Sequence, residues 1–220
     1  MLVFGHGGTP LLVFPTSMGR FYDYENRRMI DILSDRYQSG QLQAFCVDSV
    51  DKESWYDKSI PARDRVLRHM AYEQYLQDEV LPFIRERNPS PRVTVTGCSF
   101  GGYHSANFAF RFPHLVEALI SFGGAFDIHQ FLDDYYDENC YFHCPPDFLP
   151  NLNDETVLHD IRRMRIVLAA GETDMCLPDN KRLSGILQRK NIAHNLDIWG
   201  NGAGHDWPWW EQMAVKFFGQ

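Results

Sequence analysis

The amino-acid sequence predicts an α/β fold in which a mainly parallel central sheet is flanked by helices. Strand-like and helix-like segments alternate along almost all of the 220 residues, which is the pattern of parallel strands joined by crossover helices. The stretch from Arg92 to Phe112 shows this unit, because a β-branched run, a glycine-flanked serine and a helix-like segment follow one another. The length and a hydrophobic content of 44% indicate one domain, residues 1–220, with a sizeable core.

The part of the chain before this stretch contains three predicted strands and two predicted helical regions. The strands are apolar runs bounded by turn-forming residues, and the helical regions carry apolar residues at helical spacing. We expect strands at 1–5, 11–14 and 42–47, a helix that begins near 23–26 and carries Met29, Ile30, Ile32 and Leu33 on one face, and a helix over 65–87 that Pro82 kinks or divides. The first two strands would form a hairpin through His6-Gly7-Gly8-Thr9-Pro10.

The rest of the chain continues the alternation with one interruption. Strands are expected at 93–96, 118–122, 165–170 and 196–199, and helices after Ser99, at 180–190 and at 209–218. Residues 126–160 show neither the strand-like nor the helix-like spacing of apolar residues, and they are acidic, aromatic and interrupted by prolines. We therefore interpret them as a small cap insertion. The chain begins inside an apolar strand, so we expect the first edge strands to be missing or short. Such an edge leaves unpaired strand groups that a partner could cover, as in a homo-oligomer, but the sequence does not determine the oligomeric state.

Composition and charge exclude several classes of function. Lys and Arg total 21 against 29 Asp and Glu, a formal net charge of -8, whereas a surface that binds nucleic acid needs clustered cations. No stretch reaches the roughly 18 apolar residues of a membrane span, and the amino end lacks the cationic and apolar regions of a secretory leader. The five cysteines have no framework spacing. We therefore expect a cytoplasmic protein with no nucleic-acid or membrane partner.

The centre of the organising stretch is Gly97-Cys98-Ser99-Phe100-Gly101, which has the Gly-x-Ser-x-Gly spacing of a nucleophile elbow. A chain that passes from a buried strand to a helix through one tight turn forces the turning residue toward positive φ and crowds the residues two positions on either side. Glycines remove that crowding because they have no Cβ. Ser99 Oγ would then project beside the helix N-terminus, where the amide of Phe100 can donate to a developing oxyanion.

A serine hydroxyl is a poor nucleophile near neutral pH, so the elbow predicts a histidine base and an orienting carboxylate farther along the chain. RIVLAAGETD ends in Asp174 just beyond an apolar strand, on the sheet edge expected for Ser99. Glu172 and Asp179 are the alternatives, and helix capping is the competing interpretation of Asp174. LDIWGNGAGHDWPWW places His205 in a glycine-rich loop after the last strand, whereas the other eight histidines lie in turns, on helices or in the cap insertion.

An oxyanion hole needs a second amide, which usually comes from a loop beside the elbow strand. Pro15-Thr16-Ser17-Met18-Gly19 follows a buried strand and precedes a helix, so we favour the amide of Ser17, with Thr16 second. His6-Gly7-Gly8 imitates an HGG signature, but a strand follows it at once, and a hairpin turn is the better interpretation.

Cys140-x-x-His143-Cys144 contains residue types that bind metals. A zinc site needs three or four ligands in compact geometry, and the sequence has no second matched cluster apart from the distant Cys176. We therefore expect no metal ion and no cofactor. Cys98, beside the predicted nucleophile, is interpreted as a small buried side chain.

With serine, acid and histidine in that order, the chain resembles the esterase family of α/β-hydrolases that includes S-formylglutathione hydrolase, feruloyl esterase and polyhydroxybutyrate depolymerase-like proteins. The resemblance spans nearly the whole chain and rests on FPTSMG, GCSFGGYHSANFAFRFP, LAAGETD and GHDWPWW. It implies an α/β-hydrolase fold, Ser99 as nucleophile, His205 as base and Asp174 as acid. Pro15-Thr16-Ser17 stands where many members have a His-Gly pair, which leaves the second oxyanion donor open.

Aromatic residues are the candidates for substrate contact. Trp55 and Trp207 adjoin the predicted active-site loops, within a larger set that suits either the core or a pocket wall: Trp55, Tyr56, Trp207, Trp209 and Trp210. The cap insertion adds Phe126, Phe131, Tyr135, Tyr136 and Phe142. These residues suggest an aromatic-lined, partly covered pocket, and hence small or short-acyl esters instead of a long polymer chain.

The sequence therefore predicts a serine carboxylic ester hydrolase that acts through an acyl-enzyme on a small-molecule ester. An acyltransferase or thioesterase with the same three residues is the alternative among enzymes, and the choice depends on whether the pocket excludes water. A non-catalytic binding protein that keeps the hydrolase fold is the second class, because a fold alone does not prove activity.

Overall fold

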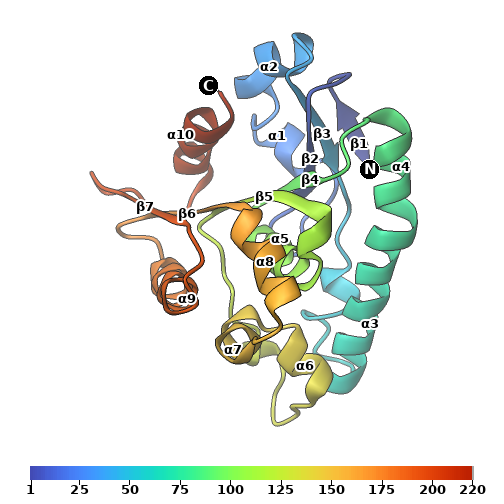
Figure 1. The fold of residues 1–220 in the computed structure, drawn as a ribbon, viewed down its shortest axis with the longest axis vertical. Coiled ribbons are helices and arrows are strands. Elements are labelled where there is room, and N and C mark those ends of the chain that lie inside the picture. Colours follow the sequence, from blue (N-terminus) through green and yellow to red (C-terminus); the bar gives the residue numbers. More distant parts are fainter. Residues whose placement is uncertain (220) are drawn as a thin grey trace.

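The computed structural model describes residues 1–219, in which seven strands form one sheet with the order β1-β3-β2-β4-β5-β6-β7 (Figure 1). Neighbouring strands are parallel except β1 and β3, which are antiparallel. The strands are β1 (Leu2–Phe4), β2 (Thr9–Phe14), β3 (Leu42–Cys46), β4 (Val93–Cys98), β5 (Val116–Phe122), β6 (Arg165–Gly171) and β7 (Asn195–Trp199). The predicted α/β fold with a mainly parallel sheet is confirmed.

The first two strands do not form the expected hairpin. β1 pairs with β3, whereas β2 lies on the other side of β3 and pairs with β4 as well. The turn between β1 and β2 therefore crosses the beginning of β3, so closely that a Cβ on Gly8 would lie 2.2 Å from the carbonyl carbon of Gln41. All of β2 except its first residue is buried, and such a strand is most stable in the middle of a sheet with a neighbour on each side.

Helices cover both faces of the sheet, because alternate side chains of each strand point to opposite faces. In β2, Leu11 and Val13 share a core with α1 (Asp23–Asn26), α2 (Ser34–Gln38) and α10 (Trp207–Phe218), which lie together on one side of the sheet in Figure 1. Leu12 and Phe14 share the other core with α3 (Ala62–Tyr75), α4 (Leu81–Arg87), α5 (Phe100–Arg111), α8 (Glu155–Arg163) and α9 (Leu177–Arg189). Within residues 1–219, no helix combines the length and apolar character needed to cross a membrane.

Two predicted helices are interrupted. The helix that begins at Asp23 does not continue through the apolar residues 29–33, because α1 ends at Asn26 and Arg28 takes a left-handed φ of 59° before a 3-10 turn, η1 (Asp31–Leu33), leads into α2. The helix expected over 65–87 is divided as predicted. A π-helical turn, η3 (Leu76–Val80), separates α3 from α4, and Pro82 is the second residue of α4, so the helical hydrogen bond that a proline cannot donate falls at this irregular turn.

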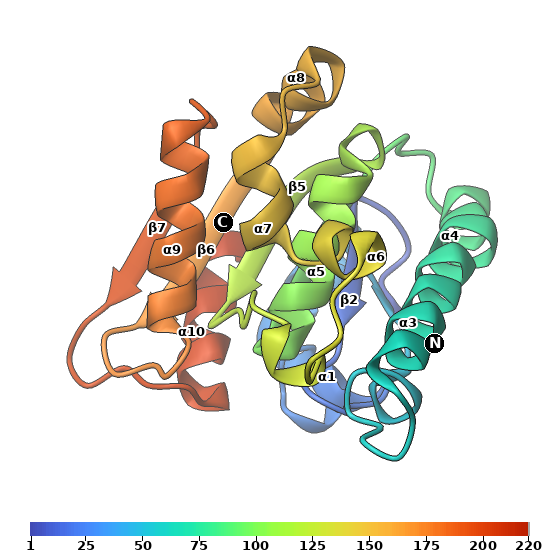
Figure 2. The ribbon, with the colours of Figure 1, turned by 90° about the horizontal axis from the view of Figure 1, so that it is seen from below.

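The cap insertion consists of short helical turns and the start of a crossover helix. It contains η5 (His129–Phe131), α6 (Glu138–Phe142), α7 (Pro145–Phe148), η6 (Leu149–Asn151) and most of α8, which buries Leu158 and Ile161 on the way to β6. Figures 1 and 2 show α6 and α7 on the outer side of α5, away from the sheet. The segment that leads into the insertion passes the nucleophile elbow, because Ala125 N–H donates to the carbonyl of Ser99 at 3.1 Å.

A buried carboxylate, Glu73 of α3, ties the insertion to the helical layer. It accepts hydrogen bonds from Arg111 Nε at 2.9 and 3.0 Å and from Asn107 Nδ2 at 2.8 Å, and His143 Nε2 lies 3.3 Å from its Oε2. Burial raises the pKa of a carboxyl group, but the hydrogen bonds and charges of His143 and Arg111 outweigh burial here, so the pKa of Glu73 is lowered. The ionised carboxylate therefore joins α3, α5 and the residue that follows α6.

Candidate active site

The nucleophile elbow predicted at Gly97 to Gly101 lies between β4 and α5. Ser99 has φ 57° and ψ -120°, an unfavourable conformation for a residue with a side chain, and its N–H donates to the carbonyl of Phe122 in β5 at 2.9 Å. A Cβ on Gly97 would lie 2.3 Å from the carbonyl carbon of Gly101, which confirms the crowding expected between these two positions. The turn therefore holds Ser99 at the carboxyl end of β4.

The three residues predicted for catalysis form one hydrogen-bonded chain. His205 Nε2 lies 2.9 Å from Ser99 Oγ, and His205 Nδ1 lies 2.8 Å from Asp174 Oδ1. With Nδ1–H donating to the carboxylate, the lone pair on Nε2 faces the serine hydroxyl and can accept its proton. The side chain of Asp174 is fully buried, while the side chain of His205 keeps 19% of its surface exposed. The imidazole is therefore oriented from inside the protein and open to a substrate on its other side.

The two alternative carboxylates are engaged elsewhere. Glu172 Oε1 accepts a hydrogen bond from Gly202 N–H at 2.6 Å and so fixes the loop that carries the histidine. Asp179 Oδ2 accepts one from Phe126 N–H at 3.1 Å, at the start of the cap insertion. The structure thus brings Asp174, and neither alternative, to the imidazole.

The two predicted oxyanion donors lie on segments in direct contact. Phe100 is the first residue of α5, and a Cβ on Gly101 would lie 2.6 Å from the carbonyl oxygens of both Phe14 and Pro15, where the loop with Ser17 begins. The competing segment, residues 6–8, precedes β2 and therefore lies at the opposite edge of the parallel sheet. The loop after β2 therefore lies beside the elbow, whereas residues 6–8 do not, although their sequence resembles the HGG signature.

Hydrogen bonds within this loop favour Ser17 over Thr16 as the donor. The amides on either side of Ser17 are committed: Thr16 N–H donates to Asp23 Oδ2 at 3.0 Å, Met18 N–H to Asp51 Oδ2 at 2.9 Å, and Gly19 N–H to the Thr16 carbonyl at 2.8 Å. For the Ser17 N–H, the described part of the chain supplies no acceptor. An amide left in this state is available to a ligand.

The two tryptophans predicted to contact substrate lie in different surroundings. Trp55 has 0% exposure, and its ring packs against His69, Tyr103 and Phe131. A side chain enclosed in this way supports the site from within the core and does not present a surface to a ligand. Trp207 is partly exposed at the start of α10, where it contacts the rings of Tyr24 and Trp210.

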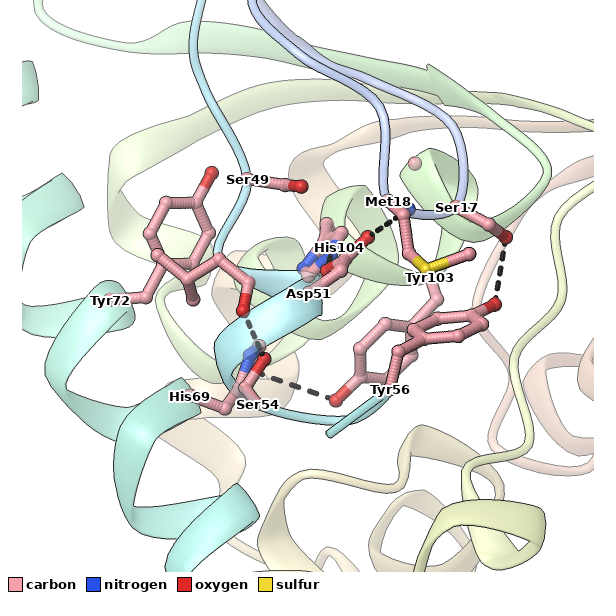
Figure 3. A network of polar contacts seen from close by, with 12 residues as sticks. Ser17, Met18, Ser49, Asp51, Ser54, Tyr56, His69, Tyr72, Tyr103 and His104 are labelled. Carbon is pink, nitrogen blue, oxygen red and sulfur yellow. Dashed lines mark hydrogen bonds and ion pairs between the residues drawn. The ribbon is translucent and has the colours of Figure 1, made fainter. Parts of the chain in front are cut away.

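Two other aromatic residues of the same set have closer contacts with the site. Tyr56 O–H donates to Ser17 Oγ at 2.8 Å, as Figure 3 shows, and the Tyr56 ring meets Phe100 edge-on with centroids 5.5 Å apart. Trp210 stands edge-on against His205 with ring centroids 4.9 Å apart. In the sequence, the only sign of their role is that they adjoin predicted active-site loops. The tryptophans next to them, Trp55 and Trp209, adjoin the same loops, so the sequence does not show which of these residues contact the site.

The side chains of two cysteines lie near the site but take no part in its hydrogen-bonded chain. Cys98 is buried and its Sγ lies 3.3 Å from Tyr24 Oη, as expected for a small buried side chain. Cys176 N–H donates to Asp174 Oδ1 at 2.7 Å and so helps to orient that carboxylate. Burial, followed by the charges of Asp174 and Asp179, raises the pKa of Cys176 to about 12, so its thiol stays protonated near neutral pH.

The residues of Cys140-x-x-His143-Cys144 do not meet at one point. Among the described residues, Cys144 groups with Asp127 and His129, and His143 groups with His69 and Glu73. In the second group the carboxylate is already bound by Arg111 and Asn107. The motif is thus divided between two clusters.

A family model described as "Putative esterase" matches residues 49–216, a range that includes Ser99, Asp174 and His205. The chain belongs to this esterase family. Family membership makes esterase or hydrolase chemistry the function to be tested, and the geometry above identifies the residues to test.

Solved structures share the fold of this esterase-family chain. A ferulic acid esterase superposes with a TM-score of 0.73 over 96% of this chain and 83% of its own, at 15% identity. The S-formylglutathione hydrolase of Staphylococcus aureus gives a TM-score of 0.66 over 97% of this chain and 80% of its own, at 16% identity. MPT51 of Mycobacterium tuberculosis gives a TM-score of 0.69 over 99% of this chain and 91% of its own, at 10% identity. Identities this low establish the α/β-hydrolase fold alone, and the search of the curated proteins finds no match.

Proposed function

We propose that this esterase-family protein is a serine carboxylic ester hydrolase that acts through an acyl-enzyme. The observation that carries the proposal is the continuous hydrogen-bonded chain from Ser99 Oγ through the imidazole of His205 to Asp174. The strained elbow at Ser99 and the uncommitted Ser17 amide support it, because acyl transfer needs both a projecting nucleophile and donors for an oxyanion.

In the proposed reaction, Ser99 Oγ attacks the ester carbonyl carbon while His205 Nε2 takes the hydroxyl proton. The carbonyl oxygen becomes an oxyanion that accepts hydrogen bonds from the amides of Phe100 and Ser17. When the tetrahedral intermediate collapses, the alcohol leaves with the proton from His205 and the acyl group stays on Ser99. Water then attacks the acyl-enzyme by the same steps and releases the carboxylic acid. Asp174 keeps Nδ1 protonated and stabilises the imidazolium in both halves of the reaction.

We further propose small or short-acyl esters as substrates. The support is local, because Phe131 of the cap insertion packs against Tyr56 and Phe100 with ring centroids 4.8 and 5.3 Å apart and so backs one side of the site with aromatic side chains. Other aromatic residues of the insertion contribute less than the sequence suggests, since Phe126 is buried in the core and Tyr136 is exposed.

Hydrolysis of p-nitrophenyl acetate, butyrate and octanoate by the wild type and by Ser99→Ala tests the proposal. We expect turnover by the wild type, a fall to background in Ser99→Ala, and a higher kcat/KM for the short esters. Turnover that survives in Ser99→Ala would exclude the serine mechanism, and equal kcat/KM for octanoate and acetate would exclude the short-acyl preference. A transfer product that replaces the free acid when an alcohol or thiol is added in excess would favour the acyltransferase alternative.

A further inference from the structure

The loop that carries Ser17 contains a residue in an unfavourable conformation. Gly19 N–H donates to the carbonyl of Thr16 at 2.8 Å, which closes a four-residue turn with Ser17 and Met18 at its centre. Met18 has φ 54°, and a positive φ at the third position of such a turn normally requires glycine or asparagine. A methionine stays in this conformation only if its surroundings hold it there.

Asp51 holds the turn from outside. It lies in the 3-10 turn η2 (Asp51–Glu53), has 0% exposure, and accepts Met18 N–H on its Oδ2 at 2.9 Å. The peptide groups on both sides of Ser17 are therefore fixed, one through the Thr16 carbonyl and the other through Met18 N–H. Because the Ser17 N–H belongs to the same planar peptide group as the Thr16 carbonyl, its direction is fixed too.

The same carboxylate is bound to the helix that begins with the other proposed oxyanion donor. His104 Nε2, one turn beyond Phe100 in α5, donates to Asp51 Oδ1 at 2.8 Å, and both side chains are buried. The ring of His104 packs against Phe14 at the end of β2 and against Phe100 itself, with centroids 5.7 and 5.1 Å apart. Figure 3 shows the pair between the loop that contains Ser17 and the helix. Two donors and full burial keep the carboxylate in one position.

A second link runs from η2 to Ser17. The carbonyl of Asp51 accepts a hydrogen bond from Tyr56 N–H at 2.9 Å, and Tyr56 O–H donates to Ser17 Oγ at 2.8 Å. Backbone and side chain of Ser17 are thus both held by the segment that begins at Asp51.

We propose that Asp51 and His104 are positioning residues that set the distance and direction between the Ser17 and Phe100 amides. The inference rests on the proposed ester hydrolysis, because the oxyanion between these amides forms only in that reaction. Neither side chain touches the reacting atoms. Without the carboxylate, Met18 returns to an ordinary φ and the turn closed by Gly19 N–H and the Thr16 carbonyl opens. The Thr16–Ser17 peptide group then rotates, and the Ser17 amide that it carries no longer points at the oxyanion.

Asp51→Ala removes the pair, and Glu73→Ala is its matched control. Glu73 is also a buried carboxylate that faces a histidine and accepts hydrogen bonds from α5, but its partners belong to α5 and the cap insertion and not to the loop of Ser17. For p-nitrophenyl acetate, Asp51→Ala should lower kcat by about 10²-fold to 10³-fold, the effect of losing one oxyanion donor, with little change in KM. Glu73→Ala should keep kcat near that of the wild type. If either alanine variant fails to fold, Asp51→Asn and Glu73→Gln replace them as a gentler pair, with a smaller but still selective loss of kcat for Asp51→Asn.

A compensating substitution separates positioning of the turn from a general structural role. Glycine occupies a φ of 54° without the cost that methionine bears, so Met18→Gly should let the turn form without the carboxylate. In the Asp51→Ala background, Met18→Gly should therefore restore kcat by about tenfold. A loss of kcat caused by damage elsewhere would not be restored by this change.

Hydrogen exchange of the Met18 amide, followed by NMR, tests the inference without relying on activity. Exchange should be faster in the Asp51 variants and unchanged in the Glu73 variants. If the wild type shows no turnover but exchange responds in this way, the proposed hydrolysis fails while the anchoring of the loop stands. Met18 exchange that does not respond to Asp51→Ala or Asp51→Asn, or equal kcat in the Asp51 and Glu73 variants, would overturn the inference.

Discussion

Replacing Asp174 by asparagine tests which carboxylate orients the proposed base. Asparagine keeps the shape of the side chain and an oxygen for His205 Nδ1–H, 2.8 Å from Oδ1 in the wild type, but it removes the negative charge. In the proposed reaction, that charge faces the imidazolium of the transition state. Because the side chain of Asp174 is fully buried and that of His205 is 19% exposed, solvent screens the pair only in part. Two unit charges at about 4 Å with an effective dielectric constant of about 20 attract by about 4 kcal/mol, which sets the upper limit of the loss.

A charge-assisted hydrogen bond contributes about 1.5–3 kcal/mol and a neutral one about 0.5–1.5 kcal/mol. The difference between them, about 1–1.5 kcal/mol, is the lower limit of the transition-state stabilisation that Asp174→Asn loses. We therefore expect Asp174→Asn to lower kcat by about 10-fold to 10³-fold, with little change in KM, because the imidazolium exists only in the transition state. The assay is steady-state hydrolysis of p-nitrophenyl acetate, with thermal unfolding to show that the variant is folded.

The alternative acids are the controls for this experiment. Glu172 is exposed and accepts Gly202 N–H, so Glu172→Gln should lower kcat by no more than about fivefold, the equivalent of about 1 kcal/mol. Asp179→Asn keeps an oxygen for Phe126 N–H and should have a similarly small effect. A larger loss of kcat in either control than in Asp174→Asn would refute the assignment of Asp174.

Three further predictions follow from the elbow, the buried carboxylate and the tyrosine at the site. Gly97→Ala places a Cβ 2.3 Å from the carbonyl carbon of Gly101, so it should lower the free energy of unfolding by about 1–3 kcal/mol and abolish labelling of the elbow serine by a fluorophosphonate. Glu73→Gln should lower the free energy of unfolding in urea at pH 7 by about 1–3 kcal/mol. Because the pKa of Glu73 is lowered in the folded protein, this stabilisation is present above the pKa of the unfolded chain and is lost as the pH falls through the folded value, so the two proteins should converge in acid. Tyr56→Phe removes one neutral hydrogen bond to Ser17 and should lower kcat/KM by about 2-fold to 13-fold, measured with p-nitrophenyl acetate.

The elbow and the sheet could be predicted because their signals are local in the sequence. Gly97 and Gly101 are brought together by a single turn, so their spacing alone reports the geometry. The buried parallel strands are continuous apolar runs, which the sequence shows directly. Asp174 follows such a strand, and His205 follows β7, a less buried strand that is parallel to it. Parallel strands that end at one edge bring the two residues to Ser99 without any knowledge of the packing.

Features that depend on distant parts of the chain could not be predicted. A glycine-rich turn between two strands looks the same whether the strands form a hairpin or β3 lies between them, because pairing is decided by burial over the whole sheet. Trp55 and Tyr56 are neighbours with similar side chains, and only the fold decides that the first enters the core and the second reaches Ser17. Asp51 and His104 are 53 positions apart, so their hydrogen bond has no signature in the sequence.

Covalent labelling by a fluorophosphonate, followed by mass spectrometry of the labelled peptides, tests most directly the claim that Ser99 is an activated nucleophile. We expect one adduct on Ser99 in the wild type, no adduct in Ser99→Ala, and slower labelling in Asp174→Asn, because the activation depends on the imidazole that Asp174 orients. An adduct on a different residue, or a folded wild-type protein that takes no label, would contradict the account.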